Sequence, residues 1–355
     1  MGLFREGAGK YFSRVERLEL RLQDPMVTVV VPTLAVGDAL EKCLNSLELQ
    51  TVDLFDVVVV DNSGVGRARA SGSRTRVIVN QRNHGFAGAV NQGIRSSRAV
   101  YVATLNDDAI ADRRWLETLI ACAESHPQAG MFACEVRLMG TLLLDSAGML
   151  IAADGSGKQR GHEQPAAGFA HAPDALFPSG SAALYRRSML DQIGLFDERF
   201  FLYCEDTDLG LRARWAGWDC RYVPGAVVEH FYSRSAGRAT PLKAYYIERN
   251  RLYTVLKNFP FGLLWRVPFA SALRYFWHVI AMLAGQGKGA EFRRSGYSAV
   301  LLPFLVLRAY AAALFSLPAL LAERRRIRTS RHIDSNEFIH LIETHTISVR
   351  QVAWL

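Results

Sequence analysis

The amino-acid sequence predicts an α/β fold in which a mostly parallel sheet is flanked by helices, followed by a C-terminal helical region that is both apolar and basic. Between residues 26 and 136, short valine-rich runs alternate with segments whose apolar residues recur at helical spacing. Beyond residue 244 the composition changes to long apolar stretches interrupted by arginine and proline. Half of the 355 residues are apolar and 21% are charged, which excludes a disordered or fibrous chain.

The individual elements follow from the local pattern. Residues 26–32 (MVTVVVP) are an uninterrupted β-branched run, which is typical of a strand buried on both faces. Leu40, Leu44 and Leu47 then recur at the spacing of an amphipathic helix. We further expect strands at 55–60, 76–80, 99–105 and 129–136, helices at 86–95 and after Asp112, and loops with short hairpins at 140–178. In such an alternation, ligands bind beyond the carboxyl ends of the strands.

Charge is divided unevenly along the chain. The formal net charge is +8, from 42 basic and 34 acidic residues. Residues 243–331 carry 15 basic and 3 acidic side chains, so the remainder is slightly acidic, with 27 against 31. A region that is basic and apolar is typical of a membrane surface more than of a nucleic-acid interface. We therefore expect this region to meet an anionic membrane, and we expect no nucleic-acid partner.

The cysteine pattern excludes two classes of small stabilised domain. The five cysteines are odd in number and include no C-x-x-C pair, which argues against a disulfide framework and against a zinc ribbon. A reducing compartment is therefore expected. Residues 1–24 mix Arg, Glu and Gly without an apolar stretch, so we expect no secretory signal there.

Carboxylates stand at the ends of two predicted strands. Asp61 ends the second strand, and Asn106, Asp107 and Asp108 end the fourth. A single strand-end Asp is commonly explained as a cap for the next helix. An adjacent acidic pair is harder to explain in that way, and it suits a hard divalent cation that is shared with a diphosphate.

A further acidic cluster opens a predicted helix. Glu205, Asp206 and Asp208 follow the aromatic stretch FFLYC. Acidic residues in a first helical turn are stabilised by the helix dipole, which is the structural explanation. Three carboxylates exceed that requirement, and one of them beside an apolar wall could serve as a general base.

In their order along the chain, these pieces resemble glycosyltransferase family 2, the inverting nucleotide-sugar transferases of the GT-A fold, and most closely its bacterial rhamnosyltransferase-like branch. The resemblance rests on VTVVVPT, VVVVDNSG, NHGFAGAVNQGI and TLNDDA, and on the text from FPSGSAALYRR through LFDERFFLYCEDTDLGLRARWAGW to VVEH. With the change in composition, it divides the chain into an N-terminal extension (1–25), a GT-A catalytic domain (26–243), a helical and membrane-associated region (244–331) and a tail (332–355).

The resemblance also implies a role for each matched residue. Asp206 would be the catalytic base with Glu205 beside it, and Asp108 and His230 would bind the metal. A lone histidine is more often structural, so both roles stay open for His230. The residues around the donor would be Pro32, Thr33, Asp61, Gly85, Gly88, Asn91, Asn106 and Asp107.

The implied activity is the transfer of one sugar from a nucleotide-sugar donor to an acceptor hydroxyl by single displacement, with inversion and with Mg²⁺ or Mn²⁺ as cofactor. We expect L-rhamnose from dTDP-rhamnose and a lipid-linked glycan acceptor, in bacterial cell-envelope polysaccharide synthesis at the cytoplasmic face of the plasma membrane. Galactofuranosyl and N-acetylhexosaminyl transfer stay open. The alternative from another class is a non-catalytic, basic, membrane-associated binding protein, which gives no reason for the strand-end carboxylates.

Two stretches of the C-terminal region are candidates for membrane contact. Residues 259–286 and 297–322 are apolar, but each contains arginine and proline. An arginine near the centre of a span costs about 2.5–3.5 kcal/mol, so we expect helices in the interface or a re-entrant pair. The purely structural alternative is a buried helical domain that packs on the body or on a partner. The basic cluster expected at the lipid headgroups is Arg324, Arg325, Arg326, Arg328 and Arg331.

Overall fold

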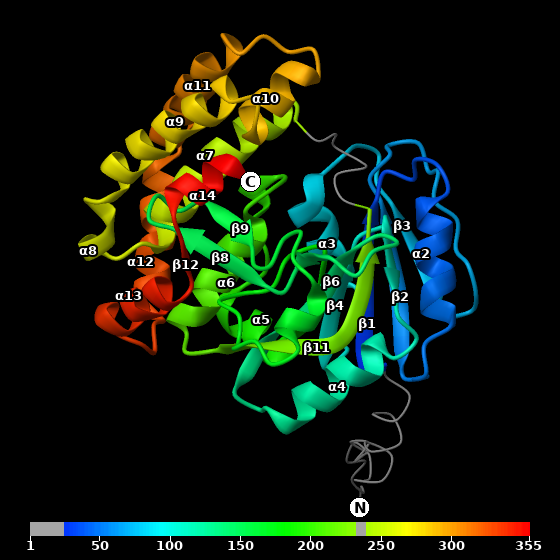
Figure 1. The fold of residues 1–355 in the computed structure, drawn as a ribbon. Helices are drawn as coiled ribbons and strands as arrows, with labels where there is room; N and C mark the ends of the chain where they lie inside the picture. The colour runs from blue at the N-terminus through cyan, green and yellow to red at the C-terminus, as the bar shows by residue number, and fades with distance from the viewer. Residues whose placement is uncertain (1–24, 232–238) are drawn as a thin grey trace, which may run out of the picture.

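The computed structural model describes residues 25–231 and 239–355, so the predicted N-terminal extension lies outside the described residues except for Pro25. A nine-stranded sheet forms the centre of the body, with helices on both faces (Figure 1). One half of it consists of parallel strands in the order β3-β2-β1-β4. These are β1 (Val27–Thr33), β2 (Phe55–Asp61), β3 (Thr75–Val79) and β4 (Tyr101–Leu105). They confirm the predicted strands and the α/β class.

The other half of the sheet is mixed. β10 (Ala182–Arg186) lies antiparallel between β4 and β6 (Ala129–Leu138), and β11 (Asp219–His230) then pairs parallel with β6. β5 (Ala109–Ala111) and β7 (Leu144–Ser146) add short antiparallel pairings. Because β1, β2, β4, β6 and β11 all run the same way, their carboxyl ends meet at one edge of the sheet.

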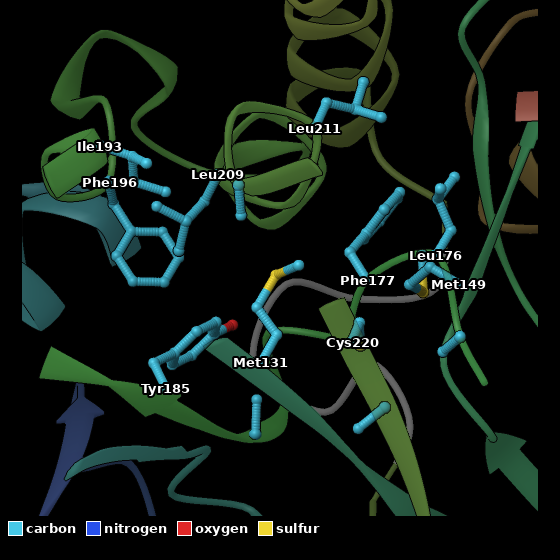
Figure 2. Close-up of a cluster of buried hydrophobic side chains, with 14 of the residues drawn as sticks. Met131, Met149, Leu176, Phe177, Tyr185, Ile193, Phe196, Leu209, Leu211 and Cys220 are labelled. Atoms are coloured by element: carbon cyan, nitrogen blue, oxygen red, sulfur yellow. The ribbon is translucent and has the colours of Figure 1, made fainter. Parts of the chain in front are cut away.

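The two faces of the sheet build separate apolar clusters. Val29 and Val31 of β1 pack on one face with α2 and α4, whereas Val30 packs on the other with α3. The second cluster continues through Met131 and Tyr185 to α5 and α6, as Figure 2 shows. The helices that cover the sheet are α2 (Ala39–Glu48), α3 (Gly85–Arg95), α4 (Trp115–Ser125), α5 (Arg187–Ile193) and α6 (Glu205–Trp215).

The region predicted to be loops and hairpins, and the C-terminal tail, form a second small sheet together. β8 (Met149–Ala152) pairs antiparallel with β9 (Gly157–Gln159) and parallel with β12 (Thr346–Ile347). The predicted helix in the tail is α13 (Ser335–Thr344), where Phe338 stacks on Trp215 of α6 with a centroid distance of 4.0 Å. The tail is therefore packed on the body, and it ends in α14 (Val349–Trp354).

Six helices fill the region between body and tail. They are α7 (Pro241–Asn258), α8 (Phe261–Leu264), α9 (Val267–Leu283), α10 (Gly287–Arg294), α11 (Leu301–Phe315) and α12 (Leu317–Thr329). They gather at the end of the molecule opposite β2, β3 and α2 (Figure 1). The domain boundary predicted after residue 243 falls inside α7, which also packs on α6.

Helix lengths limit how this region could relate to a membrane. Over the described ranges, no helix taken singly combines the length and the apolar composition of a membrane span. Two bent pairs do so jointly by length and composition: residues 261–283 with α10, bent by 51°, and α11 with α12, bent by 64°. Arg274 of α9, one of the interrupting residues, points inward and pairs with Asp154 at 2.5 Å and Glu248 at 2.6 Å.

Candidate active site

The predicted metal-binding residues come together at the carboxyl edge of the sheet. Asp108 follows β4, and His230 is the last residue of β11. Asp108 Oδ1 lies 3.1 Å from His230 Nε2, and the Asn106 amide nitrogen lies 3.3 Å from the same ring nitrogen. Asn106 and Asp108 thus both contact the same ring nitrogen, although Asp108 and His230 lie 122 positions apart in the chain.

A residue that the sequence analysis missed fixes the ring of His230. Asp145 of β7 is buried, and its Oδ2 lies 2.8 Å from His230 Nδ1. Its other oxygen lies 3.3 Å from His162 Nδ1. Burial alone would raise the pKa of Asp145, but the contacts with the two histidines lower it to about 2. Burial likewise acts to lower the pKa of His230, but Asp108 and Asp145 raise it to about 10.

This arrangement fits a divalent cation that is completed by a ligand. Within the described ranges, no three His, Cys, Asp or Glu side chains are grouped to hold a metal unaided. Asp108 could supply an oxygen ligand and His230 a nitrogen ligand once a cation displaces the proton on its Nε2, and diphosphate oxygens could supply the rest. A histidine ligand is commonly oriented by a carboxylate on its other nitrogen, which is how Asp145 stands to His230. The residues present therefore fit Mg²⁺ or Mn²⁺ shared with a diphosphate.

Asp107 sits beside this pair and faces the end of β1. Its Oδ2 accepts a 2.5 Å hydrogen bond from Thr33 Oγ1, and Pro32 precedes that threonine. Burial raises the pKa of Asp107 to about 6 against the opposing effect of the Thr33 hydroxyl, and the charge of Asp108 contributes in the same direction. Thr33 and Asp107, both predicted to contact the donor, are therefore neighbours in space.

Asp61 holds the loop that follows β2. It is fully buried, and its carboxylate accepts hydrogen bonds from the backbone N–H groups of Ser63 at 2.8 Å and Ala68 at 2.7 Å. Burial would raise the pKa of Asp61, but these hydrogen bonds lower it below the usual range. The residue shapes the loop next to the predicted donor site, and its contact with the donor stays a prediction.

Gly85 and Asn91 connect α3 to the loop in front of α6. A Cβ on Gly85 would lie 2.2 Å from the carbonyl oxygen of Phe201, to which the Phe86 N–H also donates. Asn91 exchanges hydrogen bonds with the backbone of Phe196 and donates to Glu198. Gly85 and Asn91 thus hold α3 against this loop, and their contact with the donor stays a prediction. A Cβ on Gly88 would lie 3.0 Å from His84 Cβ, within the same helix start.

The predicted base stands at the start of α6. The Asp206 carboxylate accepts from the Gly180 N–H at 2.9 Å and from the Thr207 N–H at 2.7 Å. Burial raises the pKa of Asp206, and it raises the pKa of Glu205 to about 8 with a further contribution from the charge of Asp206. Glu205 Oε2 is buried and has no hydrogen-bond partner among the described residues. Asp206 is consequently the better candidate for an ionised base near neutral pH, beside a Glu205 that holds its proton.

A two-residue segment connects the base to the predicted metal site. Gly180 donates to Asp206, while the carbonyl oxygen of Ser181 accepts from the backbone N–H of Asn106 at 2.9 Å. Both residues belong to the PSGS text before β10, which the sequence analysis quoted without giving it a role. The insertion of β10 next to β4 is what places them there.

The loop before α6 has strained backbone angles and is held in place by a side chain of α7. Phe201, Tyr203 and Cys204 have φ values of 64°, 70° and 64°, a region that side-chain-bearing residues rarely adopt. Asn250 of α7 is fully buried, and its amide donates to three carbonyl oxygens of this loop at 2.7–2.9 Å. Backbone strain of this kind persists where surrounding contacts enforce it, often at functional sites.

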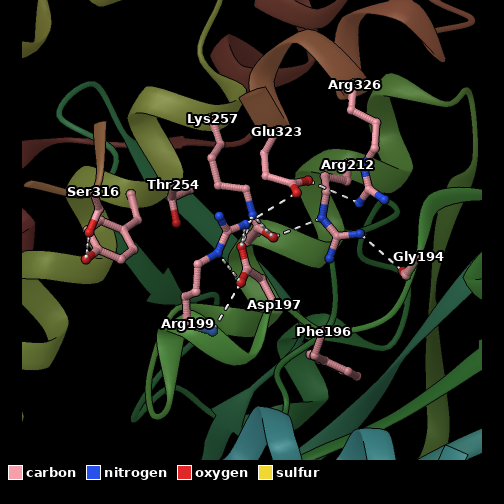
Figure 3. Close-up of polar contacts among 12 residues, drawn as sticks. Gly194, Phe196, Asp197, Arg199, Arg212, Thr254, Lys257, Ser316, Glu323 and Arg326 are labelled. Carbon is pink, nitrogen blue, oxygen red and sulfur yellow. Dashed lines mark hydrogen bonds and ion pairs between the residues drawn. The ribbon is translucent and has the colours of Figure 1, made fainter. Parts of the chain in front are cut away.

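Asp208, the third acidic residue of α6, has a structural role. It is completely buried and accepts from Arg212 at 2.9 Å, Lys257 at 2.8 Å and Asn258 at 2.9 Å. Lys257 also reaches Asp197 at 2.6 Å, as Figure 3 shows. The cations outweigh the effect of burial and lower the pKa of Asp208.

The raised pKa of Glu205 predicts a pH-dependent stability difference. The pKa of Glu205 is about 8 in the folded chain, against an ordinary value of 4.5. As pH rises between these two values, ionisation of the carboxyl lowers the free energy of unfolding by up to about 1.4 kcal/mol per pH unit. Glu205→Gln removes this ionisation. We expect the variant to gain stability over the wild type from pH 5 to pH 8 in thermal unfolding. The exposed Glu41→Gln is the control, and a pH-independent difference for Glu205→Gln would contradict the assignment.

Comparisons with known proteins identify the family to which the chain belongs. Residues 25–254 match the family described as "Glycosyltransferase like family 2". The chain is 31% identical over 288 residues to the N-acetylglucosaminyl-diphospho-decaprenol L-rhamnosyltransferase of Mycobacterium tuberculosis (strain ATCC 25618 / H37Rv), covering 70% of this chain and 89% of that protein. Among solved structures, S. aureus TarS 1–349 in complex with UDP-GlcNAc is similar at 15% identity and a TM-score of 0.49, covering 90% of each chain. A mannosyltransferase from Pyrobaculum calidifontis in complex with GDP-Man and Mn²⁺ is similar at 18% identity and a TM-score of 0.45, covering 90% of this chain and 85% of the other. The chain therefore belongs to glycosyltransferase family 2, as its resemblance to the rhamnosyltransferase-like branch predicted, and it is an enzyme.

Proposed function

We propose that this enzyme transfers one L-rhamnose from dTDP-rhamnose to a hydroxyl of a lipid-linked glycan in bacterial cell-envelope synthesis, with a divalent metal and with inversion. The main observation behind the proposal is that the Gly180–Ser181 segment lies between two different kinds of site. On one side, Asp108 and His230 form a site that suits a cation on a diphosphate. On the other, Asp206 is a carboxylate that suits a general base. The choice of sugar and acceptor rests on the rhamnosyltransferase relative, whose name gives an acceptor of N-acetylglucosaminyl-diphospho-decaprenol.

The mechanism follows from these positions. Asp206 accepts the proton of the acceptor hydroxyl while that oxygen attacks the anomeric carbon and the bond to the nucleoside diphosphate breaks. Asp108 and His230 would hold the cation, with Asp145 fixing the imidazole. When bound, such a cation stabilises the negative charge of the departing diphosphate. Attack from the face opposite the leaving group inverts the configuration, and no covalent enzyme intermediate is needed.

The donor side of the site is proposed as Pro32, Thr33, Asp61, Asn106 and Asp107. Gly85, Gly88 and Asn91 would act on it indirectly, by holding α3 against the loop before α6. Galactofuranosyl and N-acetylhexosaminyl transfer are the runner-up activities, because the same carboxylates would serve those donors equally well.

A donor screen tests the sugar. With N-acetylglucosaminyl-diphospho-polyprenol as acceptor and Mn²⁺ present, we expect transfer from dTDP-rhamnose and little from UDP-galactofuranose, UDP-GlcNAc or GDP-sugars. Asp108→Ala should abolish donor binding that depends on the metal, measured by calorimetry with and without Mn²⁺. Efficient transfer from another donor would replace the sugar assignment, and unchanged metal dependence in Asp108→Ala would remove Asp108 from the metal site.

Two isosteric variants separate the roles of the acidic pair. Asp206→Asn should keep donor binding but lose transfer by about a thousandfold or more, because the base is gone. Glu205→Gln should lose far less, because the amide resembles a protonated carboxyl. Single-turnover assays between pH 5 and 9 measure both, and wild-type transfer should fall as acid protonates Asp206. If Asp206→Asn transfers sugar at the wild-type rate, another residue is the base.

We also propose that the C-terminal helices lie on an anionic membrane surface at the cytoplasmic face of the plasma membrane. α9 presents its apolar side chains outward, while Arg274 pairs inward. A hollow between α8 and α12 is lined by Phe261 and Leu321 together with three arginines of the basic cluster. An apolar face bordered by arginines matches acyl chains beside anionic headgroups. The exposed large apolar residues are Phe261, Trp265, Phe269, Leu273, Phe276, Val279 and Leu283 on α8–α9 and Phe304, Leu307, Leu314 and Phe315 on α11.

Vesicle flotation tests this surface. We expect the wild type to float with vesicles containing anionic phospholipid and much less with zwitterionic vesicles. Arg325→Gln with Arg328→Gln should weaken binding about tenfold or more, since each charge contributes about 1 kcal/mol. Phe269→Ser with Phe276→Ser should weaken binding to both lipids. Arg113→Gln, an exposed change on the body, is the control, and a wild type that floats with neither lipid contradicts the proposal.

A further inference from the structure

Lysine is rare in this chain, and half of its lysines gather near the active site. Of the 42 basic residues only six are lysine. Lys158 lies in β9, Lys243 in the first turn of α7 and Lys288 in the first turn of α10. Phe292 of α10 belongs to an apolar cluster against which Ala244 of α7 packs, so Lys288 and Lys243 lie on touching elements, and the charges of all three lysines act on one another. The convergence is therefore a product of the tertiary fold and cannot be read as a basic run in the sequence.

The cluster of Lys158, Lys243 and Lys288 borders the first turn of α6, where the base stands. Lys243 Nζ lies 5.5 Å from the ring centroid of Tyr203, two residues before Glu205. A Cβ on Gly157, next to Lys158, would lie 3.2 Å from the hydroxyl of Thr207. β9 and the start of α7 thus contact residues on either side of the acidic pair.

The three ammonium groups act on one another, and the carboxylates that oppose them are Glu291 for Lys158 and Lys243, and Asp145 for Lys243. All three residues are half-buried. Lys288 pairs with Glu291 at 3.0 Å, whereas Lys158 makes no hydrogen bond or ion pair with any residue of the described ranges. Burial, aided by the neighbouring cations, lowers the pKa of both Lys158 and Lys243 to about 8. Partly desolvated like charges destabilise a fold unless an anion binds among them.

We propose that Lys158, Lys243 and Lys288 bind the phosphate groups of the acceptor. The inference rests on the proposed function, in which Asp206 meets the acceptor hydroxyl and the donor diphosphate lies at Asp108 and His230. A glycan linked through a diphosphate carries its phosphates at the far side of the sugar from the reacting hydroxyl. With that hydroxyl at Asp206, the phosphates reach toward the lysines, of which Lys243 is also close enough to Asp145 for the two charges to interact. Lys288 lies beyond residues 25–254, the part that matches the family, which suits a contact particular to this acceptor.

Calorimetry with inorganic pyrophosphate in EDTA tests the site apart from any metal. We expect the wild type to bind pyrophosphate and each of Lys158→Gln, Lys243→Gln and Lys288→Gln to bind it at least tenfold more weakly. Lys42→Gln is the matched control, because that lysine is exposed and pairs with Asp38. Thermal unfolding shows that the variants fold, and Lys158→Gln should not be less stable than the wild type. Absent binding by the wild type, or equal binding by all variants, overturns the proposal.

Transfer kinetics distinguish the acceptor from the donor as the source of the phosphates. With N-acetylglucosaminyl-diphospho-polyprenol, Lys158→Gln should raise the acceptor KM at least tenfold and leave the donor KM unchanged. With octyl N-acetylglucosaminide, which has no phosphate, the variant and the wild type should react alike. A raised donor KM with an unchanged acceptor KM would place the lysines on the donor and overturn the proposal. If the wild type transfers from no donor tested, the proposed function fails, and pyrophosphate binding still decides the lysine site.

Discussion

The buried charge of Asp208 is the constraint on which the active site depends. This carboxylate has no contact with solvent, and its partners come from its own helix, α6, and from α7. Removing one partner from a buried ion pair typically costs about 3–5 kcal/mol, because the remaining charge stays buried. α6 and α7 therefore cannot separate or rotate independently. Since Asp206 lies one half-turn before Asp208, the position of the proposed base is fixed by a helix of the C-terminal region.

The same helix controls the strained loop in front of the base. Asn250 of α7 satisfies three carbonyl groups of that loop, and α3 contacts it from the other side through Gly85. The loop is thus enforced by two elements that contribute no catalytic group themselves. This explains why the family match extends to residue 254 and includes most of α7, although the sheet ends at His230. The sheet, α6 and α7 are thus packed as one unit.

The sequence predicted the strand ends well and the partners of individual side chains less well. Valine-rich runs located the strands, and parallel order then required Asp61 and Asp108 to share an edge. Asp145 could not be found in this way, because it lies in a stretch without periodicity and meets His230 only through the β6–β7 pairing. Gly85 shows a second limit. A ligand and a neighbouring loop both demand the absence of a Cβ, so the pattern alone cannot tell them apart.

The two kinds of basic residue divide the C-terminal region into two surfaces. Arginine dominates where a bidentate partner or a headgroup is available, as in the inward pair of Arg274 and in the cluster on α12. The three lysines instead gather beside the elements that flank the first turn of α6, where a compact ammonium can approach a phosphate oxygen. α10, which carries Lys288, packs through Gly289 on Met282 of α9, the helix whose apolar side chains are exposed. In the proposed function, a lipid-linked diphosphate would enter its site from headgroup level. One pair of packed helices would therefore set the height of the phosphates above the membrane and their distance from Asp206.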